Sequence, residues 1–194
     1  MAIEVTYRRT KRLSMRIVKN GDVHVSAPIG VSKDMVMKFI EENRAWIEKA
    51  RKTAMERQER QNSFYGQLPL QTRKQCDEAG KRLISIVKPM CERYQKLMGV
   101  NHRGVVIKRM TSRWGRCNVK TGEIAFSIYL LLLPEWCIEH VVVHELAHLI
   151  EANHSPRFHA LMDQYFPRWR EARAETRRLC RVSEKANDDD DDRL

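Results

Sequence analysis

The stretch from Val141 to Pro156 reads V-V-V-H-E-L-A-H-L-I-E-A-N-H-S-P and places three histidines and one glutamate inside an apolar segment. The apolar residues around them recur at helical spacing from Trp136 to Leu149, which predicts a helix that packs into the core. Burying polar or ionisable side chains costs free energy unless they find partners. The chain must therefore fold so that these four side chains meet a compensating interaction.

Helical spacing places the first two histidines side by side. In an α-helix, His144 and His148 lie ~40° apart around the axis and ~6 Å apart along it, so both imidazoles can reach one ion. Glu145 is ~100° round from His144, where its carboxylate can take a proton from a water molecule on that ion. This is the H-E-x-x-H arrangement, in which two histidines bind Zn²⁺ and the glutamate acts as general base. The sequence therefore predicts one zinc ion per chain.

His154 is the best placed third ligand. A catalytic zinc usually takes three protein ligands and leaves one position open for water. Asn153 tolerates the left-handed conformation that ends a helix, and Ser155-Pro156 is typical of the start of a new one. The chain can thus turn back after the first helix and direct His154 toward the first two histidines.

Four other residues are alternative third ligands. His140 is eight residues from His148, ~12 Å along the axis, and cannot bind the same ion while the helix stays intact. His159 lies five residues beyond His154 in the next predicted helix, where a packing or surface role is more typical. Glu171 or Glu175 would supply a carboxylate from a later helix. A further alternative is that the histidines are only core or surface groups.

The order of predicted elements divides the chain into two folded regions and a tail. Residues 3–27 alternate apolar and polar side chains, with Asn20-Gly21 as a hairpin turn, and Ser32 caps a helix that runs to about Asn62. A second long helix, three strands between residues 99 and 127, and three further helices follow, one of them starting at Pro134. The sequence therefore predicts an N-terminal β-hairpin region with a long helix (residues 1–62), a metal-dependent catalytic domain (63–183) and an acidic, disordered tail (184–194).

Two groups of motifs carry a family resemblance. H-E-L-A-H-L-I-E-A-N-H-S-P-R-F, preceded by S-R-W-G-R-C-N and G-E-I-A-F-S, closely resembles the YgjP-like metal-dependent hydrolase family and, more distantly, the SprT and WLM metallopeptidases. The resemblance implies a zincin-like α+β fold, with a mixed β-sheet packed against the helix that bears the H-E-x-x-H residues. It also implies that His154 is the third zinc ligand, that Glu145 is the general base, and that the reaction is peptide-bond hydrolysis.

The same resemblance singles out Arg113, Trp114 and Gly115. A glycine beside a large aromatic residue and an arginine suits a tight loop that presents both side chains. Arg113 is a candidate to stabilise an anionic transition state or to hold a substrate phosphate or carboxylate, and Trp114 is a candidate to bind substrate by stacking. The alternative is that Trp114 belongs to the core and Arg113 to a structural pair. The strand Gly122 to Ser127 is a candidate edge strand, where an extended peptide could pair with it, and an apolar core strand with the same pattern is the alternative.

The charge of the chain is unevenly distributed. Residues 184–194 carry −4 and residues 1–183 carry +15, so the body is strongly basic. Such a field attracts polyanions, which makes nucleotides, nucleic acid and acidic proteins plausible ligands. A solvated surface of lysine and arginine among glutamates is the alternative.

Three functions follow from these features. The leading hypothesis is a zinc-dependent hydrolase, a metallopeptidase acting on peptides or proteins, in which Glu145 takes a proton from zinc-activated water. The second keeps the same metal but assigns phosphoanhydride hydrolysis of nucleotides, with Arg113 and Trp114 holding phosphate and base. The third is a basic nucleic-acid-binding module with incidental metal. Glu145 argues against this third hypothesis, because a purely structural metal site needs no general base.

The cysteines and the lengths of the apolar stretches predict the cellular location of the protein. Its five cysteines are odd in number, widely spaced and free of C-x-x-C pairs, as expected of reduced thiols in the cytoplasm. The longest apolar stretches fall short of the ~20 residues that span a bilayer. We therefore expect a soluble cytoplasmic protein that does not enter a membrane.

Overall fold

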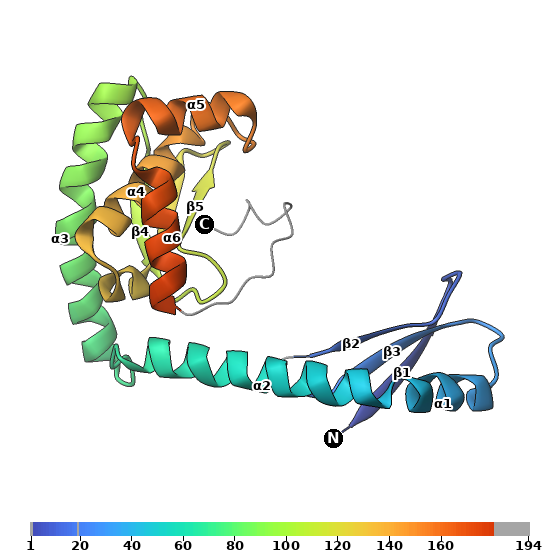
Figure 1. Cartoon of the computed structure of the whole chain (residues 1–194). Helices are drawn as coiled ribbons and strands as arrows, with labels where there is room; N and C mark the ends of the chain where they lie inside the picture. Colours follow the sequence, from blue (N-terminus) through green and yellow to red (C-terminus); the bar gives the residue numbers. More distant parts are fainter. Residues whose placement is uncertain (1, 19, 181–194) are drawn as a thin grey trace. The chain divides into compact units, whose positions relative to one another are not determined.

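The computed structural model describes residues 2–18 and 20–180 and divides the chain into two compact units (Figure 1). The first is Met1–Ser63, and the second begins at Phe64. The predicted division into domains 1–62 and 63–183 stays a prediction, and the predicted tail, residues 184–194, lies outside the described residues. Each unit has its own hydrophobic core.

The first unit is a small sheet with two helices. Its elements are β1 (Ile3–Arg8), β2 (Ser14–Ile17), β3 (Val23–Pro28), α1 (Lys33–Glu42) and α2 (Arg44–Gly66), the last residues of which enter the second unit. The strand order is β1-β3-β2, with β1 parallel and β2 antiparallel to β3. The antiparallel pairing of β2 and β3 confirms the predicted hairpin, whose turn contains Gly21 at a φ of 82°.

The single helix predicted from Ser32 to about Asn62 is wrong, because the structure has two helices that meet at Asn43. The Asn43 side chain donates to the carbonyl of Phe39 at 2.8 Å, and its backbone N–H bonds the end of α1. The Asn43 carbonyl then accepts the N–H of Ile47 at 2.9 Å in the first turn of α2. One asparagine thus ends one helix and begins the next, and the apolar periodicity continues across the break.

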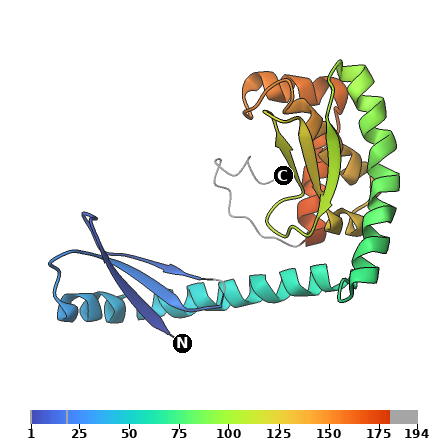
Figure 2. The same ribbon diagram turned by 180° about the vertical axis from the view of Figure 1, so that it is seen from behind.

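The second unit packs helices on one face of a mixed sheet (Figure 2). Its elements are α3 (Arg73–Met98), β4 (Gly104–Lys108), β5 (Gly115–Asn118), β6 (Glu123–Ser127), η1 (Ile128–Leu132), α4 (Glu135–Ala147), α5 (Pro156–Tyr165) and α6 (Trp169–Cys180). The strand order is β4-β6-β5, with β4 parallel and β5 antiparallel to β6. Helix α4 lies at the centre and contacts α3, α5, α6 and β5. The predicted α+β class, with a mixed sheet beside the H-E-x-x-H helix, is confirmed.

Strand order corrects one expectation. The segment Gly122 to Ser127 was expected at the sheet edge, but β6 is the middle strand and pairs on both sides. An apolar middle strand and an apolar edge strand have similar sequences, and only the pairing separates them. The edge next to α4 is β5, which contains Gly115 and Cys117.

Two further features bear on the environment of the chain. All five cysteine thiols are free. Among the described residues, none of the helices combines the length and the apolar character that crossing a membrane requires.

Candidate metal centre

The H-E-x-x-H residues lie at the C-terminal end of α4. His144 and Glu145 are in its last turn, and His148 is the residue that caps it. Beyond Ala147 the chain tightens into a turn, in which the N–H groups of residues 149–151 bond to the carbonyls of Leu146 and Ala147. The reversal of the chain therefore begins directly at the second histidine.

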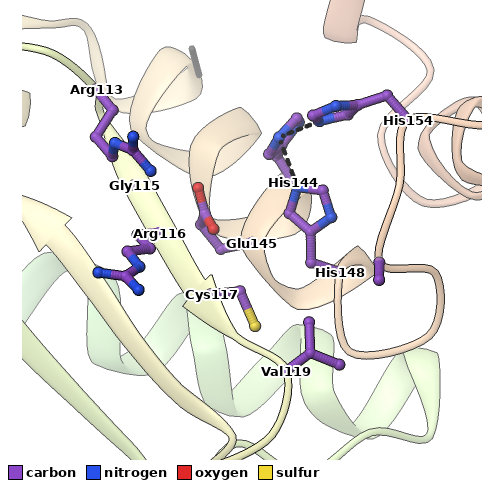
Figure 3. A pocket seen from close by; sticks show the side chains of 10 residues that line it. Arg113, Gly115, Arg116, Cys117, Val119, His144, Glu145, His148 and His154 are labelled. Carbon is purple, nitrogen blue, oxygen red and sulfur yellow. Dashed lines mark hydrogen bonds between the residues drawn. The ribbon is translucent and has the colours of Figure 1, made fainter. Parts of the chain in front are cut away.

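The turn brings the third histidine back to the first two. The Ser155 hydroxyl accepts the N–H of Phe158 at 3.3 Å and caps α5, and Pro156 occupies the first helical position. His154 immediately precedes this cap. Its side chain extends toward the end of α4, where it meets His144 (Figure 3).

The three imidazoles converge through one kind of atom. The Nε2 atom of His144 lies 3.2 Å from Nε2 of His148 and 3.1 Å from Nε2 of His154. Tetrahedral zinc with bonds of ~2.0–2.1 Å requires nitrogens ~3.3 Å apart, close to these distances. Hydrogen bonding alone fits less well, because a single ring nitrogen carries either one proton or one lone pair and cannot bond both neighbours at once. The donor set of these three residues, which we call the histidine trio, therefore fits a divalent cation.

Contacts around the trio fix the rings in this arrangement. Nδ1 of His148 lies 3.2 Å from the carbonyl oxygen of Glu151, which can only accept. Nδ1 must therefore carry the proton, which leaves the lone pair of Nε2 directed at the site. The buried ring of Phe158 packs against all three imidazoles, with centroids 4.7–4.9 Å away. Sequence reasoning did not assign Phe158 a role, although it lies in the motif that carries the resemblance.

Burial keeps the first ligand neutral. The His144 side chain is 3% exposed, and desolvation, reinforced by the neighbouring histidines, lowers its pKa well below the ordinary value. A neutral imidazole offers its lone pair without having to lose a proton first. The low pKa of His144 and the convergence of the three imidazoles therefore both favour binding of a cation.

Glu145 lies beside the trio and is almost completely buried, at 1% exposure. Desolvation raises the pKa of its carboxyl to about 8, while the positive charge of Arg113 and a hydrogen bond from the Cys117 backbone N–H lower it. A cation held by the trio would lower the pKa further, because it favours the ionised form. The carboxyl is thus held against the edge strand β5 by the backbone N–H of Cys117 and by the positive charge of Arg113.

Gly115 makes this position possible. An added Cβ at residue 115 would lie 2.6 Å from both Cγ and Cδ of Glu145, a distance that real side chains do not reach. Gly115 and Cys117 are two residues apart on β5. The Glu145 carboxyl lies against Gly115, which has no side chain, and accepts the backbone N–H of Cys117. The sequence singled out Gly115 for a tight loop, whereas the structure assigns it this close approach.

The trio and Glu145 line a cleft of about 300 Å³ (Figure 3). One wall is formed by the trio and the loop after α4, and the other by β5 and its flanking residues. Of the predicted substrate-contacting residues, Arg113 lines this cleft. Residues that the sequence did not single out also line it: Arg116, Cys117, Val119 and Ala152.

Trp114 lies elsewhere. Its ring packs against Phe64 and Tyr65, with centroids 6.2 and 6.5 Å away, and it is absent from the lining of the cleft. This position corresponds to the alternative in which Trp114 is part of the core. Arg113 and Trp114 are neighbours in the chain, but their side chains lie in different surroundings.

The alternative ligands are also placed away from the trio. His159 stacks on Trp169, with ring planes 13° apart. Glu171 pairs with Arg168, and Glu175 pairs with Arg178. His140 is fully buried one turn before His144, where burial lowers its pKa to about 4, and neither of its ring nitrogens has a hydrogen-bond partner among the described residues.

Comparison with known proteins identifies a matching family. A family model described as YgjP-like, metallopeptidase domain, matches residues 11–76 and 67–179. Among solved structures, the metallopeptidase zymogen of Pyrococcus abyssi abylysin is 26% identical over 47% of this chain and 92% of that chain, with a TM-score of 0.44. No curated protein sequence matches the chain. The family match covers the histidine trio, Glu145 and β5.

We expect Gly115→Ala to destabilise the protein, because its methyl group would overlap the Glu145 carboxyl. Overpacking of this kind costs about 1–3 kcal/mol in the free energy of unfolding, which urea denaturation would measure. Gly104→Ala in β4 is the matched control, since no heavy atom lies within 4 Å of the added Cβ. Equal effects of the two substitutions would contradict the close approach.

We expect the wild-type chain to bind one Zn²⁺ and His154→Ala to bind it more than about 100-fold more weakly. Loss of a residue that only hydrogen-bonds a metal ligand already weakens metal binding by about 10–100-fold, and loss of the ligand itself costs more. His159→Ala is the control and should bind like wild type, because His159 stacks on Trp169. Competition with a chromophoric chelator measures both affinities. The reverse ranking of the two variants would show that the trio is wrongly assigned.

Proposed function

Because the chain belongs to the YgjP-like family of metallopeptidases, we propose that it is a zinc-dependent peptidase in which Glu145 is the general base. The observation that carries this proposal is the convergence of three Nε2 atoms beside a buried carboxyl in an accessible cleft. A histidine trio alone would also suit a structural ion. A buried carboxyl placed beside the trio is the additional group that a hydrolytic site requires.

When bound, the cation supplies a Lewis acid that polarises the scissile carbonyl and makes water more acidic. His144, His148 and His154 hold it, and the hydrogen bond from His148 to the Glu151 carbonyl keeps that ring oriented. Glu145 accepts the proton of the attacking water on a carboxylate oxygen and passes it to the leaving amine. In the site without the cation, burial raises the pKa of Glu145, which makes its carboxylate a stronger base than an exposed glutamate.

Arg113 and β5 would act on the substrate. The Arg113 guanidinium lines the cleft and can stabilise negative charge on the carbonyl oxygen or bind a substrate carboxylate. Since β5 is an edge strand beside the trio, an extended peptide would pair with those backbone groups of β5 that Glu145 does not engage, the role that the sequence had suggested for β6.

Hydrolysis of nucleotide phosphoanhydrides is the second candidate for this site. Arg113 and Arg116 both line the cleft and would attract phosphate. Against it, the proposed base platform Trp114 packs on Phe64 and Tyr65. The peptidase is therefore the function that the residues and the family support best, and nucleotides belong in the same substrate screen.

We expect Glu145→Gln to bind zinc like wild type but to lose about 10²–10⁴-fold in turnover, because the amide keeps the shape and cannot accept the proton. His148→Ala should lose both zinc and turnover. Elemental analysis and hydrolysis of a quenched fluorescent peptide library measure the two quantities. Normal turnover by Glu145→Gln would remove Glu145 as the base.

We expect kcat/KM to rise with pH through the titration of Glu145, since only the ionised carboxylate accepts a proton. The charge of Arg113 lowers the pKa of Glu145, so Arg113→Gln should move this acidic limb to higher pH. Arg116→Gln is the control, because Arg116 lines the cleft without contributing to that pKa. An acidic limb that Arg113→Gln leaves in place or moves to lower pH would contradict the coupling.

A further inference from the structure

The positive charge of the first unit is concentrated in its first strands. Residues 1–19 contain six lysines and arginines and one acidic residue, Glu4. Residues 20–63, which form β3 and the helices, contain eight lysines and arginines and seven acidic residues, so their charge is nearly balanced. Five of the six cations of residues 1–19 therefore lie in β1, β2 and their connection.

The sheet of this unit has one covered and one open face. Helices α1 and α2 pack on the covered face (Figure 1), and Val25 of β3 belongs to the same core cluster as Val36 and Ile47 of these helices. Paired residues of neighbouring strands point to the same side, so the strand register defines the other side. We call this side the open face, and its residues are Glu4, Thr6, Arg8, Ser14, Arg16, His24, Ser26 and Pro28.

The open face carries two exposed arginines at opposite ends. Arg8 pairs in register with Pro28, and Arg16 with His24, four residues away along β3, which is ~13 Å. Between them the hydroxyl residues Thr6, Ser26 and Ser14 form one row across the three strands. The face therefore alternates cationic and hydrogen-bonding groups.

The single carboxylate of the open face is already engaged. Glu4 lies 3.1 Å from Nε2 of His24, on the neighbouring strand. The exposed connection between β1 and β2 adds further cations, Arg9, Lys11 and Arg12. None of the cations at residues 8–16 has an acidic partner among the residues that the structure describes, whereas Arg44 and Lys38 on the helices do.

We propose that the open face, together with the connection between β1 and β2, binds the phosphates of double-stranded nucleic acid. Four of these five cations are arginines, whose planar guanidinium matches phosphate oxygens with two parallel hydrogen bonds. A duplex presents one charge per ~1.7 Å of its axis, so a face ~13 Å long meets several phosphates at once. The serine and threonine hydroxyls supply the neutral contacts that commonly accompany such cations.

A duplex fits this surface better than a single strand. Proteins that bind single strands stack the bases on aromatic side chains, and the eight residues of the open face include no phenylalanine, tyrosine or tryptophan. Contacts to phosphates alone carry no sequence information, so the binding is independent of sequence. The inference concerns the first unit and does not rest on the proposed peptidase.

The test measures binding of the full chain to a short fluorescein-labelled DNA duplex by anisotropy at several salt concentrations. Arg8→Gln with Arg16→Gln removes two phosphate contacts, so the slope of log affinity against log salt should fall by about two. At 0.1 M salt, this corresponds to roughly fiftyfold weaker binding. The matched control, Lys52→Gln with Arg57→Gln on the exposed side of α2, removes the same charge and should bind like wild type.

Four results would overturn the proposal. They are no salt-dependent binding by the wild-type chain, equal losses in the two double variants, tighter binding of a single strand than of the duplex, and binding of anionic phospholipid vesicles in place of DNA. The vesicle measurement is needed because Ile29, next to Pro28, is 68% exposed and could contact a lipid surface.

Discussion

The buried carboxyl of Glu145 is the constraint on which the rest of the site depends. An ionisable group at 1% exposure has to be compensated, and its partners come from β5 and the segment just before it: the N–H of Cys117 in β5 and the charge of Arg113. The carboxyl can approach the strand only where there is no side chain, which requires glycine at residue 115. The contact between the Glu145 side chain and the backbone of Gly115 therefore sets the position of α4 relative to the sheet edge.

The histidine trio depends on where α4 ends. The turn after Ala147 and the Ser155 cap of α5 together return the chain within a few residues, so His154 reaches His144. Phe158, in the first turn of α5, then packs against the three rings and limits their rotation. Local signals of helix termination and initiation thus build the site, and the core of the second unit holds both helices in place.

The sequence predicted those parts of the site that local periodicity determines. Helical spacing was enough to pair His144 with His148, and the Asn153 to Pro156 turn was enough to select His154 for the trio that the structure brings together. Strand order was not predictable from local pattern, so β6 was expected at the edge that β5 occupies. The side to which Trp114 points and the break at Asn43 likewise depend on packing and on one side-chain cap, neither of which changes the apolar periodicity.

X-ray absorption at the zinc edge of the zinc-loaded full chain tests the central claim most directly, because it reports which atoms surround the ion. The account predicts three imidazole nitrogens and one further light atom at ~2.0–2.1 Å, with no sulfur. Cys117 also lines the cleft, and burial raises the pKa of its thiol to about 12, which disfavours the thiolate that a metal requires. A sulfur neighbour at ~2.3 Å, or fewer than three imidazoles, would contradict the assignment of His144, His148 and His154.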